Sequence, residues 1–324
     1  MTAEEHELEQ LRPTSFAIAY RMLGSVSEAE DVVQEALLRV HQAIEAGEQI
    51  ASPRAYVATV TTRLAINELR SARARREQYV GEWLPEPLLT TGVDDPAQHA
   101  EMADSLSLAM LVLLESLSPE QRAALLLHDV FDYGYPEIAE IIGKSEENVR
   151  QLASRARRHV EKGRPRFQTS PEQREELVQR FLAAAQHGDL AGLEALLAHD
   201  VVLTGDGGGK VPALARSLHG RNRVARVLLT WMRITSRLDV TLRATEVNGG
   251  PGAMLLDDQQ QLISVWSLEV AGGEIYSISS VVNPDKLAHL GTVADFAVLV
   301  RAYRARPDRP ADPQAHTHNP GATQ

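Results

Sequence analysis

Cysteine is absent from this 324-residue chain. Its absence excludes disulfides, thiolate zinc sites and cysteine nucleophiles. Long hydrophobic runs are missing too: no apolar stretch approaches the roughly 20 residues that span a bilayer, and the acidic start MTAEEHELEQ is not a signal peptide. We therefore expect a cytoplasmic protein that does not act at a membrane.

The chain also lacks an excess of positive charge. It has 33 Lys and Arg against 44 Asp and Glu, which gives a formal net charge of −11. A chain with this balance does not coat nucleic acid by bulk electrostatics, so DNA binding would need local basic patches or help from a partner. The 44% hydrophobic content can fill real cores, and the length predicts about two or three domains.

A helix-turn-helix is predicted between Gly134 and His159. Pro136 suits a first helical position, Gly143 ends the first helix, and Ser145 can cap the second. Apolar residues at i, i+3, i+4 and i+7 bury one face of the second helix. Its outward face carries the residues that could read DNA, namely Arg150, Gln151, Ser154, Arg155 and Arg158. An ordinary helical hairpin with a solvated arginine face is the alternative.

Residues 1–78 predict a first helical domain. Its first helix covers 11–23, and Ser27 and Glu30 have the spacing of a capping box for the second. The polar side of the second helix carries Asp31, Gln34 and Glu35. The third helix starts near Pro53 and ends in the basic run LRSARARR. A cluster of arginines this dense in an acidic protein suits phosphate neutralisation, although a solvated surface is the alternative.

The segments YRMLGSVSEAEDVVQEALLRV and SPRAYVATVTTRLAINELRSARARR resemble region 2 of bacterial sigma factors of the extracytoplasmic-function (ECF) group. The resemblance implies that Asp31, Gln34 and Glu35 dock on the clamp of core RNA polymerase. It also implies that the third helix captures the melted promoter −10 element, through Asn67, Arg70, Arg73 and Arg76. The family commonly has Asp at the position of Asn67.

Residues 79–104 are rich in Pro, Gly, Thr and Asp and predict a linker. Trp83 and Leu84, in its WLPEP run, are apolar enough that we expect them to dock on a neighbouring surface. The run resembles the linker of ECF proteins that carry an additional C-terminal domain. Residues 105–163 predict a second helical domain with a capping box at Ser118 and Gln121. This domain resembles sigma region 4, which reads the promoter −35 element.

A third domain is expected at residues 171–290, after a polar tether at 164–170. Helices at 172–187, 189–198 and near 221–232, followed by alternating strands, predict an α+β cone or half-barrel. The pattern resembles the SnoaL-like fold, a common small-molecule pocket, which implies room for an unidentified small ligand. The fold class is therefore multidomain, with two all-α helical domains followed by an α+β SnoaL-like cone-shaped barrel. Residues 291–324 form a C-terminal extension, expected to be disordered after about residue 304.

The third domain offers few residues for catalysis. Asp206, His219 and Asp257 are the polar candidates, but no carboxylate pair or histidine dyad stands out, so we expect no enzyme activity, cofactor or metal. The run GDGGGK does not match a P-loop, because its lysine stands where the second glycine belongs. In ECF proteins with this fused domain, DGGGK and NPDKL resemble recurring motifs. The resemblance implies domain-contact roles for Asp206, Lys210, Asn283, Pro284, Asp285 and Lys286.

The residues and the resemblance together predict a dissociable subunit of RNA polymerase that confers promoter specificity. Its partners would be core RNA polymerase and promoter DNA. The fused domain is expected to regulate this activity in place of a separate anti-sigma factor. The alternative is a ligand-sensing transcription regulator that binds duplex DNA without docking on polymerase.

Overall fold

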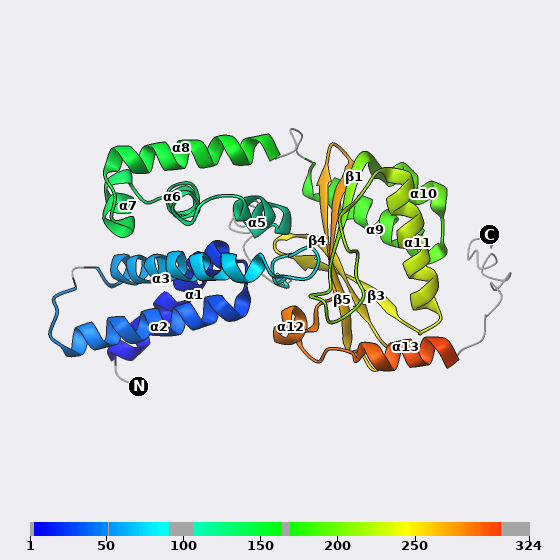
Figure 1. Ribbon diagram of the computed structural model, residues 1–324, viewed down its shortest axis with the longest axis horizontal. Coiled ribbons are helices and arrows are strands. Elements are labelled where there is room, and N and C mark those ends of the chain that lie inside the picture. The colour runs from blue at the N-terminus through cyan, green and yellow to red at the C-terminus, as the bar shows by residue number, and fades with distance from the viewer. Residues whose placement is uncertain (1–2, 51, 91–105, 164–168, 306–324) are drawn as a thin grey trace, which may run out of the picture.

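The computed structural model describes residues 3–50, 52–90, 106–163 and 169–305 (Figure 1). Helices α1–α3 form a first helical module, α5–α8 form a second, and the elements from α9 to α13 form the C-terminal domain. Both helical modules lie on the same side of the C-terminal sheet. The predicted disorder of the tail concerns residues outside the described ranges. Within these ranges, no helix is both long and apolar enough to cross a bilayer.

The first helical module consists of α1 (Ala3–Leu23), α2 (Val26–Glu45) and α3 (Pro53–Arg76). The predicted capping box at Ser27 and Glu30 is wrong. Gly24, with φ of 68°, ends α1, so the next residue must already cap α2. That residue is Ser25, whose Oγ accepts a hydrogen bond from the Glu28 amide at 3.2 Å.

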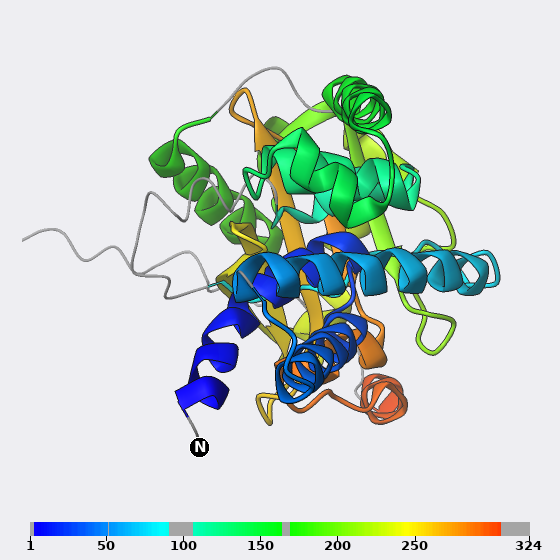
Figure 2. The ribbon, with the colours of Figure 1, turned by 90° about the vertical axis from the view of Figure 1, so that its left-hand side faces the viewer.

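The second helical module consists of α5 (Leu108–Glu115), α6 (Pro119–Asp129), α7 (Tyr135–Ile142) and α8 (Glu146–Gly163). The predicted helix-turn-helix is confirmed as α7 and α8. Gly143 has φ of 67°, and the Ser145 Oγ accepts from the Asn148 amide at 3.3 Å. The capping box of Ser118 and Gln121 is also confirmed. When the molecule is viewed from its helical side, α3 lies between the second module and α2 (Figure 2).

The C-terminal domain places α9 (Pro171–His187), α10 (Leu190–Leu196) and α11 (Arg221–Ser236) against one face of a sheet (Figure 1). The six strands are ordered β2-β1-β6-β5-β4-β3. Their bounds are β1 Leu197–Asp206, β2 Leu218–His219, β3 Thr241–Val247, β4 Gly250–Leu256, β5 Leu262–Ala271 and β6 Glu274–Val281. A short helix, α12 (Pro284–Leu287), and the helix α13 (Phe296–Ala305) follow the sheet. This agrees with the predicted α+β domain.

The sheet is buried on both faces at its centre, which the alternating pattern did not predict. In β5, Trp266 packs in the core beneath α9–α11, while Val265 belongs to a second cluster that includes Leu84 and Leu108. The second face is therefore covered by the linker and by α5. The predicted strand from Leu238 starts only at Thr241. Two residues with positive φ, Asn248 and Gly249, turn the chain from β3 into β4.

Candidate nucleic-acid interface and its interdomain latch

The basic helix α3 is engaged by the second helical module. The Arg63 guanidinium donates from Nε to the Ile141 carbonyl at 2.8 Å and from Nη2 to the Glu140 carbonyl at 2.9 Å. These carbonyls form the C-terminal end of α7, where the partial negative charge of a helix attracts cations. Arg70 pairs with Glu120 of α6 at 2.5 Å. Arg63 and the predicted DNA-facing Arg70 are thus both held against the second module.

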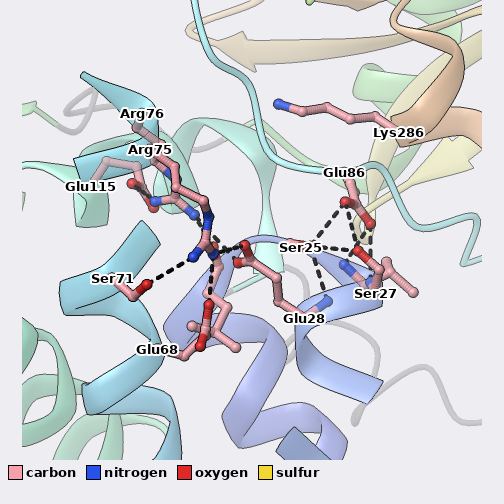
Figure 3. Close-up of polar contacts among 12 residues, drawn as sticks. Ser25, Ser27, Glu28, Glu68, Ser71, Arg75, Arg76, Glu86, Glu115 and Lys286 are labelled. Atoms are coloured by element: carbon pink, nitrogen blue, oxygen red, sulfur yellow. Dashed lines mark hydrogen bonds and ion pairs between the residues drawn. The ribbon is translucent and has the colours of Figure 1, made fainter. Parts of the chain in front are cut away.

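The C-terminal end of α3 is held by contacts that reach a buried side chain. Arg76 pairs with Glu115 of α5 and donates to the Leu23 carbonyl at 2.6 Å. Glu115 also pairs at 2.5 Å with Arg122, which is fully buried. Arg75 reaches Glu28 and Glu68, each at 2.6 Å (Figure 3). Glu115 therefore joins Arg76 of the first helical module to the buried Arg122 of the second module.

The remaining residues predicted to face the −10 element are placed as follows. Asn67 is exposed, and its Oδ1 accepts from Arg70 at 3.4 Å. The Arg73 side chain lies outside the part of the chain that the structure describes. Burial acts to raise the pKa of Glu120, but the hydrogen bond from Arg70 and a backbone hydrogen bond outweigh it, so the pKa is lowered. Glu120 is therefore an ionised partner of Arg70 near neutral pH.

The residues predicted to bind polymerase lie together on the outer face of α2. Asp31 and Gln34 are exposed. Glu35 is half-buried and pairs with Arg39 one turn later at 2.7 Å. Since the core of the module uses the opposite face of α2, this surface is open to a partner in the conformation seen here.

The predicted −35 surface on α8 is also open. Arg150, Gln151, Ser154, Arg155 and Arg158 are all exposed. The Arg150 Nε donates to Glu146 on the same helix at 3.2 Å, and the Arg158 Nε donates to the Ser154 carbonyl at 3.3 Å. The apolar positions Val149, Ala153 and Ala156 are fully buried. The structure thus brings the five residues to one accessible helix face.

A buried ion pair fastens the linker to the C-terminal domain. Asp206, at the end of β1, is completely buried and pairs with Lys286 of α12 at 2.7 Å. Its carboxylate also accepts from the Tyr79 hydroxyl at 2.5 Å and from the Leu84 amide at 2.9 Å. We call this set of contacts the latch. A buried carboxylate is stable here because the Lys286 charge and three further donors, Tyr79, Leu84 and Gly208, satisfy it.

Lys286 completes the latch from α12. Its ammonium also donates to the Leu84 carbonyl and lies 4.2 Å from the centroid of the Trp83 ring. Burial lowers the pKa of Lys286, while Asp206 opposes the shift. Asn283 donates to the Tyr79 hydroxyl at 2.8 Å. The expected docking of Trp83 and Leu84 is confirmed: Leu84 is only 2% exposed, and the Trp83 ring stacks on Arg76 of α3 as well.

The linker also contacts the first helical module through Glu86. This carboxylate accepts from the Val26 amide at 2.7 Å and from the Ser25 hydroxyl at 2.9 Å, so it sits at the N-terminus of α2 (Figure 3). The Glu86 carbonyl accepts from the Tyr20 hydroxyl at 2.6 Å. Asn248 of the C-terminal domain donates to the same Tyr20 oxygen at 2.7 Å. The linker, the first helical module and the C-terminal domain thus meet at this buried point.

The motif residues of the C-terminal domain therefore divide into two groups. Asp206, Asn283 and Lys286 contact the linker, and Pro284 stands at the first position of α12 next to them. Lys210 and Asp285 pair with each other at 2.5 Å, and their side chains are 53% and 63% exposed. The contacts of Asp206, Asn283 and Lys286 outside their own domain thus go to Tyr79 and Leu84 of the linker.

Gly208 shows why the glycine run is needed. It has φ of 59°, and a Cβ at this position would lie 2.3 Å from the Asn283 side-chain nitrogen. Its amide donates to Asp206 at 3.0 Å. The run GDGGGK therefore forms a tight turn that lets Asn283 approach.

A cavity of about 510 Å³ lies where the C-terminal domain meets α5 and the linker. Strands β5 and β6 supply one wall, Glu82 to Leu84 a second, and Ser107 to Leu113 of the α5 region a third. Glu269 at its edge accepts from the Ala109 amide near the start of α5 at 3.2 Å. Burial raises the pKa of Glu269, although hydrogen bonds and Arg174 act against the shift. The volume suits a small molecule.

The residues considered for catalysis are not gathered in this cavity. Asp206 belongs to the latch, and Asp257 accepts from the amides of Gln259 and Gln261 at 2.9 and 2.7 Å, which makes it part of a turn. His219 is exposed on β2. Over residues 3–50, 52–90, 106–163 and 169–305, no group of His, Asp and Glu is arranged to hold a metal ion.

Several residues of the interface escaped sequence reasoning. Tyr79 and Glu86 act through partners more than 50 residues away, so no local pattern identifies them. Asn248 precedes Gly249, and Asn-Gly is the strongest short-range hairpin signal; that signal could have located the β3–β4 turn. It could not have revealed that the Asn248 side chain is buried against Tyr20.

The fold defines a chain with two helical modules, each with a basic helix, and a C-terminal domain joined to them through a docked linker. Family models agree: Sigma-70 region 2 matches residues 8–75, Sigma-70, region 4 matches 107–160, and the SnoaL-like domain matches 178–276. The chain belongs to the ECF RNA polymerase sigma factors, a family whose members direct transcription initiation by RNA polymerase.

Within that family the chain is SigJ-like. It is 39% identical over 293 residues to the ECF RNA polymerase sigma factor SigJ of Mycobacterium tuberculosis, which covers 87% of this chain and 93% of that protein. It is 34% identical over 277 residues to the probable ECF sigma factor SigI of the same organism, covering 83% and 90%. The crystal structure of SigJ matches with a TM-score of 0.69 at 36% identity, covering 87% of this chain and 98% of that one. These relatives indicate a transcription factor rather than an enzyme.

Proposed function

We propose that this chain is a promoter-specificity subunit that its C-terminal domain holds in a closed, inactive form. In the active form, α2 docks on core RNA polymerase through Asp31, Gln34 and Glu35. The helix α3 then binds the melted −10 element, through Asn67, Arg70, Arg73 and Arg76. The helix α8 reads the −35 element, through Arg150, Gln151, Ser154, Arg155 and Arg158.

One observation carries the proposal of a closed form. Arg63, Arg70 and Arg76 of α3 are bound by groups of the second helical module: two carbonyls at the end of α7 and the carboxylates of Glu120 and Glu115. Carbonyl and carboxylate oxygens satisfy the same guanidinium donors that phosphate oxygens would. A −10 strand and the second module therefore compete for Arg70 and Arg76, so the modules must separate before promoter capture.

The C-terminal domain stabilises this closed form through the linker. Region 2 and region 4 are joined in sequence by the linker, and its docked part, residues 79–90, is held at the latch and at Glu86. The two helical modules can separate only when the docked part of the linker is released. Release of the linker breaks the hydrogen bonds that Tyr79 and Leu84 donate to the buried Asp206 carboxylate, and hydrogen bonds to charged groups contribute about 1.5–3 kcal/mol each. The latch thus acts as the fused domain's restraint, the task that a separate anti-sigma factor performs for other sigma factors.

The 510 Å³ cavity supports a role for a small ligand in this control. Its walls come from the C-terminal domain, the linker and α5, so a molecule that fills it contacts all three. Such a ligand binds the closed form better than the open one and shifts the population toward the closed form. Titration of a metabolite mixture against the full chain, followed by native mass spectrometry, checks this: retention of a small molecule by wild type and not by Ser279→Trp, which fills the cavity, is the expected outcome.

Multi-round transcription with core RNA polymerase tests the main proposal. The chain should initiate at a cognate promoter, and Asp31→Ala with Gln34→Ala should weaken binding to core polymerase about 10-fold or more. Arg150→Ala with Arg155→Ala should leave polymerase binding unchanged and reduce transcription only from promoters that depend on the −35 element. Identical defects in both pairs would contradict these assignments.

Transcription and DNA-binding assays together separate the proposal from the alternative of a ligand-sensing regulator. A ligand-sensing regulator would bind duplex promoter DNA tightly without polymerase and would give no transcript with core enzyme alone. Duplex binding by the isolated chain, measured by fluorescence anisotropy at 150 mM salt, should be weak, since the net charge is −11. Tight specific binding together with no initiation would favour the rival.

A further inference from the structure

Tyr135 begins α7 on the DNA-facing side of the helix-turn-helix, and no part of the proposed function uses it. Its ring packs on the apolar cluster formed by α6, α7 and α8 and is only partly exposed. The Arg150 guanidinium lies 4.8 Å from the ring centroid, and the His128 ring lies 4.3 Å away at an angle of 31°. A rigid, packed ring therefore supports an exposed arginine that is assigned to reading DNA.

Arg150 is fixed from a second direction as well. Glu146, one turn earlier on α8, accepts from its Nε at 3.2 Å. The His128 ring, which packs on Tyr135, lies with its Nδ1 2.9 Å from Asp129 of α6, and the Arg157 Nε of α8 donates to the same carboxylate at 2.7 Å. Tyr135 is thus joined to α6 and α8 at once, which fixes the plane on which the Arg150 guanidinium rests.

The contact with the Tyr135 ring affects both the conformational entropy and the orientation of the Arg150 side chain. A free arginine side chain carries about 2 kcal/mol of rotamer entropy, and immobilising such a side chain on binding costs roughly 0.5–1.5 kcal/mol. A guanidinium already stacked on a ring has lost part of that freedom before it meets DNA. Arginine recognises guanine through two parallel hydrogen bonds, and this recognition depends on the orientation of the guanidinium plane.

We propose that Tyr135 is a positioning residue for −35 recognition, which orients Arg150 for the base edge that this arginine reads. The inference rests on the proposed function of α8. It assigns Tyr135 no contact with the base itself. The loss of Tyr135 should therefore reduce discrimination at one base pair, the one that Arg150 reads, while contacts to phosphates elsewhere keep their strength.

The experiment uses the full chain with core RNA polymerase, a cognate promoter and a set of single-base-pair variants of its −35 element. Tyr135→Phe keeps the ring and should retain most of the wild-type discrimination. Tyr135→Leu keeps apolar packing but loses the aromatic face, and should lower transcription from the cognate promoter about 2- to 5-fold, the value of an exposed cation–π contact. Its discrimination should fall at the same position that Arg150→Ala affects.

A double-mutant cycle separates positioning from a structural role. If Tyr135 acts through Arg150, then Tyr135→Leu in the Arg150→Ala background should cause no further loss. A full additional loss, or an equal loss at every −35 variant, would overturn the inference and leave Tyr135 a packing residue. The mobility of the Arg150 Nε–H in the free chain, measured by NMR relaxation, should rise in Tyr135→Leu and stay low in Tyr135→Phe.

The outcomes also distinguish this inference from the proposed function. If no variant or wild-type chain initiates transcription, the proposed function fails. If wild type initiates but Arg150→Ala changes no base preference, the assignment of Arg150 and the positioning role of Tyr135 fail together, while the sigma function stands. If Arg150→Ala changes the preference and Tyr135→Leu does not, only the positioning role fails.

Discussion

The two basic helices of this sigma factor differ in what surrounds them. On α3, Arg63, Arg70 and Arg76 all have partners in the second helical module. On α8, the predicted DNA-facing side chains are exposed, and the hydrogen bonds of Arg150 to Glu146 and of Arg158 to the Ser154 carbonyl lie within the helix. Of the two surfaces proposed to bind DNA, the one on α3 is engaged by protein and the one on α8 is exposed. Under the proposed function, this difference places control at the −10 surface, which must be uncovered, rather than at the −35 surface.

The partners of α3 explain why the linker matters. Glu115 and Glu120 belong to the second module, which follows the linker in sequence, while α3 precedes it. Contacts between α3 and the second module therefore close a loop whose length the docked linker fixes. Release of the linker lengthens the loop and lowers the effective concentration of one module at the other. The contrast between α3 and α8 thus predicts which substitutions activate transcription.

The largest effect is expected from Asp206→Ala. It removes the carboxylate that satisfies Lys286, Tyr79 and the Leu84 amide, and loss of one partner of a buried pair costs about 3–5 kcal/mol. The linker should then undock, so hydrogen exchange of the Leu84 and Glu86 amides should accelerate roughly 10²- to 4 × 10³-fold. Transcription should rise, because α3 becomes available more often.

Lys210→Ala is the matched control for the latch. It removes a charge from the same turn, but its pair with Asp285 is exposed, and exposed pairs contribute about 0–1 kcal/mol. Exchange of the linker amides and transcription should stay near wild type. Equal effects from Lys210→Ala and Asp206→Ala would mean that general charge, and not the buried latch, sets the behaviour of this domain.

A smaller effect is expected from Arg63→Ala, because the side chain is exposed and donates to neutral carbonyls. A loss of about 1 kcal/mol from the closed contact corresponds to roughly a 5-fold increase in the open population. Since Arg63 is outside the residues assigned to DNA, transcription should rise. Arg243→Ala, which removes a surface arginine of the C-terminal domain, should change nothing. A drop in transcription for Arg63→Ala would instead assign this arginine to DNA.

The smallest effect is a pH dependence at Glu269. Its pKa is raised above its ordinary value of 4.5, so the folded contact binds the proton more tightly than the open form does. The stabilisation is complete below 4.5 and is lost as the pH rises through the raised pKa. Exchange of the Ala109 amide, compared between wild type and Glu269→Gln at each pH, should reveal this slope. Arg174 and Tyr276 face the carboxyl and stay unchanged in both proteins.

At the contact between α3 and α6, the lowered pKa of Glu120 gives the opposite dependence of stability on pH. The pKa of Glu120 is lowered below its ordinary value of 4.5, so its contribution to the closed form is present above 4.5 and is lost as the pH falls through the lowered pKa. Glu120→Gln should therefore remove an acid-induced opening of α3 from α6. An unaltered opening in that variant would contradict the role of the Arg70–Glu120 pair.

Sequence reasoning worked where the signal is local. Pro136, Gly143 and Ser145 specify the ends of α7 and α8 by their own backbone chemistry, and the structure agrees. It failed for the start of α2, because Ser25 and Ser27 both suit a cap and only the one-residue connection after Gly24 decides between them. The strand pattern of β5 was incomplete because α5 and the linker bury its second face, a fact that depends on packing between domains.

The candidate site shows the same limit. Exposure of Arg150 and Arg155 follows from helical periodicity, so the accessible face of α8 could be predicted from the sequence. The contacts of Arg63 with the end of α7 and of Tyr79 with Asp206 join residues 77 to 127 positions apart. No periodicity or motif reports such pairs. Resemblance marked Asp206 and Lys286 as contact residues, but their partners became evident only in three dimensions.

The most direct test of the closed form is a distance measurement between the two helical modules. The chain has no cysteine, so Gln42→Cys on α2 and Glu161→Cys on α8, both exposed, give a unique pair of spin-label sites. The account predicts one narrow distance distribution for the free chain, a longer distance when core RNA polymerase is bound, and a partial shift to the longer distance in Asp206→Ala without polymerase. An unchanged distance in a complex that initiates transcription would contradict it, because α3 would then bind promoter DNA without leaving the second module.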